Sequence, residues 1–277
     1  MENIINKCYD EERALYGSEN LYLVDCQFDG AADGESALKE SSNILVEKCF
    51  FNLRYPFWHN DELTIAESEM TLNCRAPIWY SKNIQIDRCK INGVKAVREC
   101  QGLRLYDSKI VSSEFGWLTK DMKIRRADIE GEYLMLHSKN IDMQESNILG
   151  KYSFQYIENA VIDKCSFNTK DAFWHAKNVT ITNSVIKGEY LGWYSEGLTL
   201  KNCKIIGTQP LCYCKNLTLV DCEMIEADLS FEKSDVEATL IAPIISIKNP
   251  SSGIIKVPLC NENIMKDAQS TCQIITK

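Results

Sequence analysis

The chain has 277 residues, of which 45% are hydrophobic and 25% charged, and its formal net charge is −8. These proportions are ordinary for a soluble globular protein, and the negative charge argues against nucleic acid or an anionic membrane as a partner. No apolar run of signal-peptide type begins the chain, and none approaches the ~20 residues of a membrane-spanning helix. We therefore expect a cytoplasmic protein, with no membrane partner, whose thirteen cysteines are reduced thiols.

Residues 1–18 precede the periodic part of the chain. Within them, Asp10–Tyr16 has the composition of a short helix, and Asp10 is a suitable N-cap. The first rung of a repeat protein exposes a strand edge unless something covers it. The sequence therefore predicts a short helical cap over residues 1–18.

Residues 19–238 repeat one unit of about 19 residues. Between Gly188 and Met224 the unit occurs twice, since Leu198 and Leu217 are 19 residues apart and so are Cys203 and Cys222. A fixed period of this length is the signature of a repeat architecture. Taking the first apolar residue of each unit as position 0, that position holds Leu21, Ile44, Leu63, Ile84, Leu103, Met122, Ile141, Ala160, Val179, Leu198, Leu217 and Val236. We predict about twelve rungs, a rung being one turn of a solenoid.

Each unit carries the alternation of short strands. Positions 0 and +2 are apolar with mostly polar residues between them, and positions +5 (Cys, Ser or Ala) and +7 (large and apolar) form a second such pair. Polar residues at +4, Gly at +9 and Asn or Gly at −1 are expected at corners. Position −6 is expected inside, on a third strand. The pattern predicts an all-β, single-stranded parallel β-helix, and crossover chirality favours a right-handed coil.

After Glu237 the repeat loosens. Asn249, Pro250 and the following Ser-Ser-Gly form a turn signal between two short apolar segments. The sequence therefore predicts a β-rich cap over residues 239–277, in the same domain as the solenoid.

All five tryptophans occupy one position of the repeat, position −5. That column also contains charged and polar residues, so we expect it to face outward: Trp58, Trp79, Arg98, Trp117, Gln155, Trp174 and Trp193. The small or apolar column at −7 is expected to flank it on the same face, and the −4 column holds all three histidines together with Tyr80, Tyr156, Tyr194 and Tyr213. Apolar ribbons of this size usually mark an interface or a ligand groove.

Three interpretations of the ribbon remain open. A second copy of the chain or the C-terminal segment covers it, or it stacks sugar rings, or it lines a catalytic groove. As ligand-binding residues we nominate Trp58, Trp79, Arg98, Trp117, Trp174, Trp193, Tyr194, Gln209 and Tyr213.

The densest polar cluster is expected on the late rungs. There Asp171, His175 and Glu189 are the candidate acid–base residues beside the tryptophans, and the alternative is that they are turn and ladder residues without a catalytic role. The Cys212-x-Cys214 pair has no matching second pair, so we expect no metal site and no cofactor.

Several phrases of the chain resemble the bacterial domain-of-unknown-function 3737 family. They are DGESALKE (33–40), FWH (57–59), PIWYS (77–81), DAFWH (171–175), GEYLGWYSEGLTLKNC (188–203) and GTQPLCYCKNLTLVDC (207–222). The resemblance covers nearly the full length. It implies a single-stranded parallel β-helix in a cytoplasmic bacterial protein of unassigned function, and it transfers no catalytic residue.

Together these patterns favour a non-enzymatic binding or interaction scaffold that works through the aromatic face, as a homodimer and with a saccharide or other small molecule as a further ligand. The alternative is a carbohydrate-active enzyme, a lyase, hydrolase or isomerase, with its site on the late rungs. Enzymes with this fold carry acids on adjacent rungs, and the acids at position +3 (Glu47, Asp87 and Asp163) never fall on successive rungs.

Overall fold

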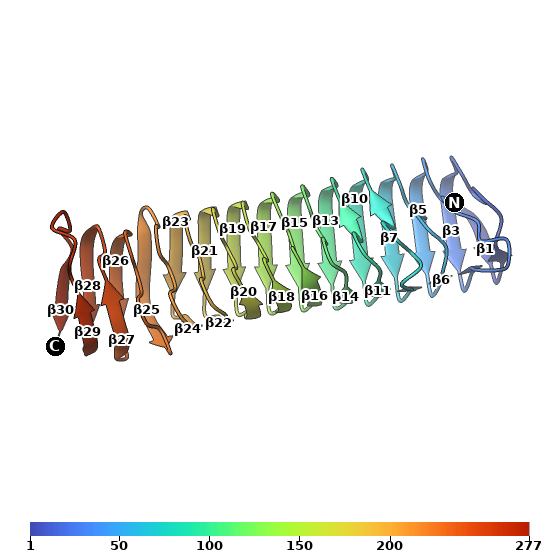
Figure 1. The fold of residues 1–277 in the computed structure, drawn as a ribbon. Helices are drawn as coiled ribbons and strands as arrows, with labels where there is room; N and C mark the ends of the chain where they lie inside the picture. The colour runs from blue at the N-terminus through green and yellow to red at the C-terminus, as the bar shows by residue number, and fades with distance from the viewer. Residues whose placement is uncertain (277) are drawn as a thin grey trace. The chain divides into compact units, whose positions relative to one another are not determined.

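The computed structural model describes residues 1–276, which form a parallel β-solenoid of about 14 rungs at a spacing of about 19 residues (Figure 1). No helix occurs among these residues. The predicted all-β parallel solenoid is therefore confirmed, whereas its right-handed sense stays a prediction. The chain divides into two compact units, Met1–Asp142 and Met143–Lys277, here called unit 1 and unit 2.

Each rung contributes one six-residue strand to a first wall, with few exceptions. The strands are β1 (Glu2–Ile5), β3 (Glu19–Val24), β5 (Ser42–Glu47), β7 (Asp61–Ala66), β10 (Lys82–Asp87), β13 (Gln101–Tyr106), β15 (Lys120–Arg125), β17 (Lys139–Gln144), β19 (Glu158–Asp163), β21 (Lys177–Thr182), β23 (Glu196–Lys201), β25 (Leu217–Ile225), β26 (Asp235–Leu240), β28 (Ser252–Val257) and β30 (Gln273–Thr276). Neighbours pair in parallel with like positions opposite each other, as Ile84 does with Leu63 and Leu103. Positions 0 and +2 point inward because strand side chains alternate.

A second wall follows the bend at position +4. Its strands are β2 (Cys8–Tyr9), β4 (Gln27–Phe28), β6 (Phe50–Phe51), β8 (Glu69–Met70), β11 (Lys90–Asn92), β14 (Lys109–Val111), β16 (Asp128–Glu132), β18 (Asn147–Lys151), β20 (Ser166–Lys170), β22 (Val185–Lys187), β24 (Lys204–Ile206), β27 (Ile244–Lys248) and β29 (Cys260–Ile264). Phe28, Phe51 and Phe167 at position +7 are buried. The predicted core columns at 0, +2, +5, +7 and −6 are therefore confirmed.

The third side of each rung is built mostly from turns, so the predicted third strand is largely wrong. Only β9 (Ile78–Trp79) and β12 (Val97–Arg98) form strands there among the described residues. The physical reason lies in the backbone: residues at −8 and −4 have positive φ, as in Tyr190 (56°) and Tyr194 (60°), which an extended strand excludes. The turns of neighbouring rungs still bond to each other, since the Tyr194 N–H donates to the Cys212 carbonyl at 3.2 Å.

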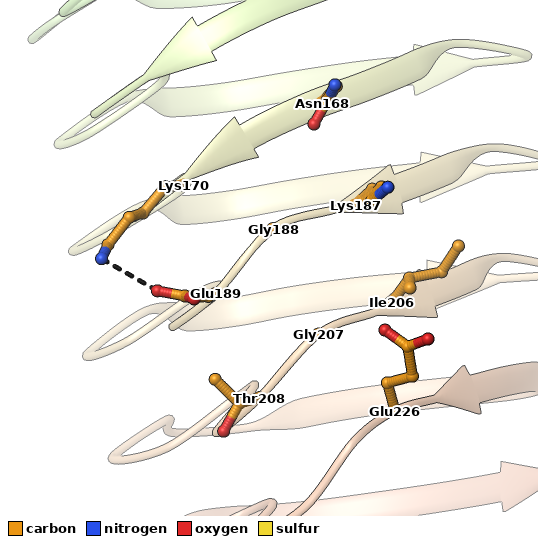
Figure 2. Close-up of a pocket in the computed structure, with 9 residues that line it drawn as sticks. All are labelled: Asn168, Lys170, Lys187, Gly188, Glu189, Ile206, Gly207, Thr208 and Glu226. Atoms are coloured by element: carbon orange, nitrogen blue, oxygen red, sulfur yellow. Dashed lines mark ion pairs between the residues drawn. The ribbon is translucent and has the colours of Figure 1, made fainter.

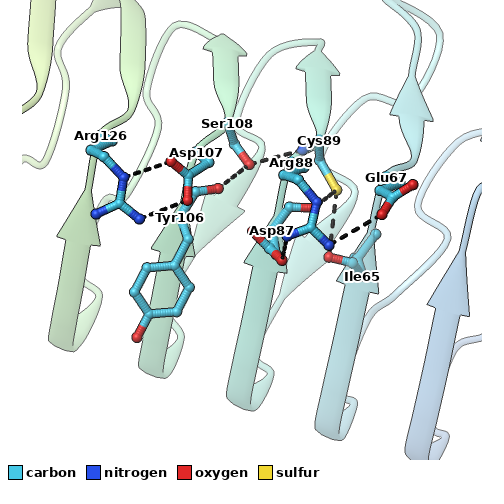
Figure 3. A network of polar contacts seen from close by, with 9 residues as sticks. All are labelled: Ile65, Glu67, Asp87, Arg88, Cys89, Tyr106, Asp107, Ser108 and Arg126. Atoms are coloured by element: carbon cyan, nitrogen blue, oxygen red, sulfur yellow. Dashed lines mark hydrogen bonds and ion pairs between the residues drawn. The ribbon is translucent and has the colours of Figure 1, made fainter.

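The small polar residues at position +5 satisfy backbone groups at the bend. The Cys89 N–H donates to Ser108 Oγ of the next rung at 2.9 Å, and Ser108 Oγ donates to the Tyr106 carbonyl at 2.6 Å (Figure 3). The Cys165 N–H donates to Ser184 Oγ in the same way at 3.0 Å. A buried N–H without a partner is costly, which favours the small hydrogen-bond acceptors Ser and Cys at most positions of this column.

The corner at position +4 carries charges of alternating sign in unit 1. Arg88 pairs with Glu67 at 3.2 Å, and Arg126 Nε lies 2.7 Å from Asp107 Oδ1 (Figure 3). The hydrogen bonds from Arg126 lower the pKa of Asp107. These pairs are exposed and contribute little stability individually, but like charges on adjacent rungs would repel.

The predicted helical cap at residues 1–18 is wrong. Strands β1 and β2 form a complete first rung, and residues 11–17 form turns whose backbone bonds to the next rung: the Arg13 N–H donates to the Glu35 carbonyl and the Leu15 N–H to the Ala37 carbonyl, both at 2.9 Å. Peptide groups that bond to the neighbouring rung cannot form the hydrogen bonds of a helix. These residues therefore do not form the helix that their composition favours.

The C-terminal segment is β-rich as predicted, and it continues the rungs. Strand β26 runs through the expected boundary at residue 238, and β28 and β30 extend the first wall in parallel while β27 and β29 extend the second. These extra rungs and the first one explain why about 14 rungs are present rather than twelve. The strands of this segment pair with neighbouring rungs, so the segment is part of the solenoid and does not cover the aromatic residues.

Candidate functional site

In unit 1 the outward residues at position −5 form a continuous stack, and Tyr80 packs edge to face on Trp79 at 5.7 Å; together they are called the unit 1 ladder (Trp58, Trp79, Arg98 and Trp117, with Tyr80). The rings of Trp58 and Trp79 lie 5.1 Å apart and almost parallel. The Arg98 guanidinium sits between Trp79 and Trp117, at 5.1 and 5.0 Å from their ring centres. Glu99 and Glu114 hold Arg98 through ion pairs of 3.3 and 3.5 Å. A cation between two indoles is an attractive arrangement, so Arg98 completes the stack.

In unit 2 the outward residues at −5 and −4 form two adjacent stacks, here called the unit 2 ladder (Trp174 and Trp193, with Tyr156, His175, Tyr194 and Tyr213). The two indoles lie 5.5 Å apart and nearly parallel. His175 lies between Tyr156 and Tyr194 at 4.7 and 5.0 Å, and Tyr194 stacks on Tyr213 at 4.9 Å. Residues in register on parallel rungs repeat at ~4.8 Å, which is close to the separation that stacked rings require.

Every indole N–H is used inside the protein. Trp58 donates to the Ala76 carbonyl at 2.6 Å, Trp193 to the Gln209 carbonyl at 2.7 Å, and the other three donate to the residue at position −8 of the next rung. Gln155, which replaces Trp in the column, makes the same bond to the Asp171 carbonyl at 2.9 Å. Each of these side chains therefore ties its rung to the next one.

The aromatic face includes fewer exposed repeat positions than the sequence predicts. The −7 column was expected to flank the tryptophans on the surface, but it is buried, as Ala96, Phe115 and Leu191 illustrate. At the last rungs the −5 column also turns inward, since Cys212 and Phe231 are 1% and 0% exposed. The burial of the −7 column follows from the turn, because residues with positive φ break the two-residue alternation on which the prediction depended.

The ring faces in the ladders are largely covered by their neighbours. Each indole is stacked above or below by another ring or by a cation, and Tyr190 and Tyr213 approach Trp193 edge to face at 5.3 and 5.4 Å. What remains open are ring edges and the outer parts of Tyr80, Tyr156 and Tyr194, which are 40%, 41% and 46% exposed. The ladders thus expose mainly the edges of their rings, and few ring faces are free for a ligand to stack on.

The late-rung cluster is only partly brought together. Glu189 forms an ion pair with Lys170 at 2.8 Å, and the Lys170 ammonium lies 5.2 Å from the Tyr190 ring. The Asp171 N–H donates to the Glu189 carbonyl at 3.0 Å, and Asp171 is 5% exposed. Burial raises the pKa of Asp171; Lys170 opposes this shift and Glu189 adds to it. Asp171 is thus buried, whereas its neighbour Glu189 is exposed and paired with Lys170.

His175 belongs to the unit 2 ladder rather than to the acidic pair. Its imidazole is enclosed between two phenol rings, and burial lowers its pKa. Burial therefore favours the neutral imidazole over its charged form. Of the two nominated polar residues beyond it, Gln209 contributes its carbonyl to Trp193, and Tyr213 donates to Glu232 at 3.5 Å.

A trough that the sequence reading missed lies beside Glu189 in unit 2 (Figure 2). Its volume is about 560 Å³, and its lining residues are Asn168, Lys170, Lys187, Gly188, Glu189, Ile206, Gly207, Thr208 and Glu226. These residues occupy positions +8 to +10 of successive rungs. The available signal was the glycine column at +9, which was interpreted only as a corner.

Family comparison covers almost the whole chain. The model of the family described as "Protein of unknown function (DUF3737)" matches residues 2–276. The chain belongs to this family. The resemblance seen in the sequence phrases is thereby confirmed, and the family carries no assigned function. No curated protein matches this DUF3737 chain.

Several solved structures match the DUF3737 chain, all at very low identity and with low TM-scores. PfbA, a surface adhesin of Streptococcus pneumoniae, is 8% identical with a TM-score of 0.42, covering 79% of this chain and 85% of its own. A mutant of the periplasmic alginate epimerase AlgG is 9% identical with a TM-score of 0.27, covering 94% and 78%. The catalytic domain of a GH87 alpha-1,3-glucanase, in complex with nigerose, is 10% identical with a TM-score of 0.26, covering 99% and 63%. These likenesses carry no argument about function.

The cysteines of the DUF3737 chain are all free thiols in the structure. Cys212 and Cys214 are 1% exposed, and burial raises their pKa values to about 12 and about 11. Within residues 1–276 no group of three or more His, Cys, Asp or Glu side chains is placed to hold a metal ion. The same residues include no helix able to cross a membrane.

We predict that Asp171→Asn makes the DUF3737 chain more stable at pH 7. The folded pKa of Asp171 lies above its ordinary value of 3.8, so the folded state binds more protons than the unfolded state above that pH. Stability is therefore lost as pH rises from about 4 through the raised pKa. The advantage of the variant should be present at pH 7 and vanish below about pH 4, as measured by urea unfolding across pH.

Glu189→Gln is the matched control for this prediction. It removes the exposed ion pair with Lys170 together with the repulsion between Glu189 and Asp171, and because these two effects oppose each other its effect should stay under about 1 kcal/mol. If Asp171→Asn is instead destabilised at pH 7, the attraction of the Asp171 carboxylate to Lys170 outweighs the effect of burial and the assignment is wrong.

Proposed function

We propose that the protein is a non-enzymatic interaction scaffold, and that a second copy of the chain covers its aromatic ladders in a homodimer. The observation that carries the proposal is the outward row of ring edges and exposed tyrosines, including Tyr80 at 40% and Tyr194 at 46% exposure. Aromatic residues are enriched in protein–protein interfaces because they bury large areas with little loss of conformational freedom.

The geometry of the ladders favours a protein partner over a stacked sugar. A sugar ring stacks on the face of an aromatic ring, and the faces of Trp79 and Trp193 are already covered by neighbouring groups. The indole N–H groups are also already bonded to backbone carbonyls. A broad surface that contacts ring edges and phenol groups is the partner that suits such a ladder.

The charges beside the ladders support a second copy as that partner. In unit 1, the basic residues at position −5, Lys39 and Arg98, are each followed at −4 by a glutamate, Glu40 and Glu99. In unit 2, Lys248 pairs with Glu232 at 3.0 Å, and Glu232 accepts a hydrogen bond from Tyr213 of the ladder. A surface with both signs of charge is compatible with itself, and two-fold dimers are by far the commonest homo-oligomers.

Sedimentation equilibrium tests this proposal. We expect the wild-type protein to show twice the chain mass at micromolar concentration, and Tyr80→Glu and Tyr194→Glu each to shift it toward the monomer. An unpaired carboxylate buried in an apolar interface is unfavourable by several kcal/mol. Val161→Glu is the matched control, since Val161 is 56% exposed on β19, outside the ladders. A monomeric wild type, or ladder variants that remain dimeric, would contradict the proposal.

A carbohydrate-active enzyme is the second candidate. One observation favours it: Asp171, whose pKa is raised by burial, lies beside Glu189, which is paired with Lys170. Two carboxyls in unlike environments can act as acid and base. We rank this candidate second because Asp171 is only 5% exposed and His175 is enclosed in the unit 2 ladder.

A further inference from the structure

We propose that the unit 2 trough binds a neutral oligosaccharide. The trough and the aromatic ladders share no residue, so this inference does not rest on the proposed dimer. Its volume of about 560 Å³ falls in the range typical of small-ligand sites, about 300–1,000 Å³. Figure 2 shows polar side chains along both sides of a floor formed by Gly188 and Gly207.

The trough exists because its floor has no side chains. A Cβ on Gly188 would lie 2.1 Å from the Thr169 carbonyl oxygen, and one on Gly207 would lie 2.2 Å from the Gly188 carbonyl oxygen. Both residues also have φ above +130°, which other residues rarely adopt. Glycine thus brings each rung against the one before it and leaves a channel between the +8 and +10 columns.

One side of the trough carries hydrogen-bonding groups that the protein itself does not use. Asn168, Lys187 and Glu226 line it (Figure 2), and none of the three side chains forms a hydrogen bond or ion pair with another residue in 1–276. The opposite side is held in place, because Lys170 pairs with Glu189 at 2.8 Å and Thr208 Oγ1 donates to Asp228 Oδ1 at 2.5 Å. One side of the trough is therefore held by internal contacts, and the other side offers hydrogen-bond donors and acceptors that the protein does not use.

The charges select an uncharged ligand. Two lysines, Lys170 and Lys187, and two glutamates, Glu189 and Glu226, line the trough, so their formal charges cancel. A polyanion would meet the two carboxylates and a polycation the two ammonium groups. Sugar hydroxyls both donate and accept hydrogen bonds, and an amide, an ammonium group and a carboxylate in succession can satisfy them.

The backbone of the floor argues against an added peptide strand. The Gly188 N–H donates to the Ile206 carbonyl at 2.9 Å, and the Gly207 N–H to the Ile225 carbonyl at 3.0 Å. Strand addition needs free backbone groups, and these are committed to the next rung. The lining side chains come from four successive rungs, about 14 Å in all at ~4.8 Å per rung, so the ligand is an extended chain of several sugar rings.

Unit 1 offers a comparison at the same positions of the repeat. Its trough measures about 310 Å³ and is lined by Leu72, Gly93, Val94, Val111, Ser112, Ser113, Glu130, Gly131 and Glu132. No lysine is among these residues, and aliphatic side chains replace the amide and ammonium groups. The glycine floor alone therefore does not produce the balanced polar lining, which is particular to unit 2.

Isothermal titration calorimetry of the full chain tests the proposal. The probes are glucose hexasaccharides with α-1,4, β-1,4 and β-1,3 linkages, with hexagalacturonate and hexameric chitosan as charged counterparts. We expect at least one neutral hexasaccharide to bind, and Lys187→Met combined with Glu226→Gln to weaken its binding about tenfold or more. Both side chains are on the surface and unpaired, so the variant should fold, and its unfolding midpoint serves to check this.

Glu130→Gln is the control, because Glu130 holds in the unit 1 trough the position that Lys187 holds in unit 2. Its affinity should equal that of the wild type. The proposal is overturned if no neutral hexasaccharide binds at millimolar concentration, if a charged oligomer binds more tightly, or if the double variant binds as the wild type does. The proposed dimer is judged separately by its mass, so the two can fail independently.

Discussion

Gly188→Ala is expected to lower the free energy of unfolding by about 3 kcal/mol or more. Two costs add: a positive φ of 154°, which is unfavourable by about 1–3 kcal/mol for a residue with a Cβ, and a contact of 2.1 Å with the Thr169 carbonyl oxygen. Overpacking of this kind typically costs about 1–3 kcal/mol. The obstacle is backbone, which cannot move without opening the pairing between rungs.

Gly17→Ala is the matched control for this prediction. Gly17 also has positive φ, at 66°, but no atom lies within 4 Å of the position a Cβ would take. Its substitution should therefore cost about 1–2 kcal/mol, from the backbone alone. Urea unfolding of both variants measures the difference. Equal losses would mean that close approach between rungs does not require glycine at position 188.

Trp79→Ala is expected to lower the free energy of unfolding by about 3 kcal/mol. The indole is half-buried, stacks on Trp58 at 5.1 Å and lies 5.1 Å from the Arg98 guanidinium. Losing part of its buried area costs about 1.5–2 kcal/mol, and each ring or cation contact adds about 0.5–1 kcal/mol. Leu118→Ala, at a side chain 43% exposed on the same face, should cost under about 1 kcal/mol.

A double-mutant cycle isolates the contact between Trp79 and Arg98. Combining Trp79→Ala with Arg98→Ala should give a coupling energy of about 0.5–1.5 kcal/mol, because each variant removes the same contact. The four unfolding curves, of the wild type, the two single variants and the double variant, are compared under one set of conditions. Strict additivity would show that the guanidinium is merely near the rings, and the unit 1 ladder would then not be a cooperative stack.

The fold could be predicted from the sequence because the solenoid repeats its constraints. Position +2 is apolar on rung after rung, and Leu23, Ile86 and Leu200 are all fully buried. Strand parity follows from alternation, and alternation is visible in the residues themselves. The corner at position −1 could be predicted equally well. Asn20 and Asn43 have positive φ there, and the Asn43 amide donates to Asn20 Oδ1 at 2.6 Å.

The errors arose where alternation ends. Positions −8 to −4 form turns, so Phe115 and Leu191 point inward although parity placed them beside the tryptophans. Asp10–Tyr16 has helical composition, but its backbone is bonded to the following rung. In both cases long-range hydrogen bonds decide the local conformation, and a single sequence does not display them.

For the candidate site, the sequence predicted which repeat positions place aromatic residues on the outside, but it did not predict which side chains contact one another. The outward tryptophans follow from the repeat, whereas the insertion of Arg98 between two of them depends on rotamers. The separation of His175 from Asp171 likewise could not be anticipated, because stacking on Tyr156 and Tyr194 holds the imidazole in the ladder. The trough escaped notice because its floor consists of residues without side chains.

Hydroxyl-radical footprinting at low and high protein concentration tests most directly whether a second copy covers the aromatic ladders. The account predicts that Tyr80, Tyr156 and Tyr194, which are 40–46% exposed, react in dilute solution and become protected as the protein associates, while Met265, 39% exposed, keeps its reactivity. Tyrosines that react equally at both concentrations, or protection confined to other surfaces, would contradict it.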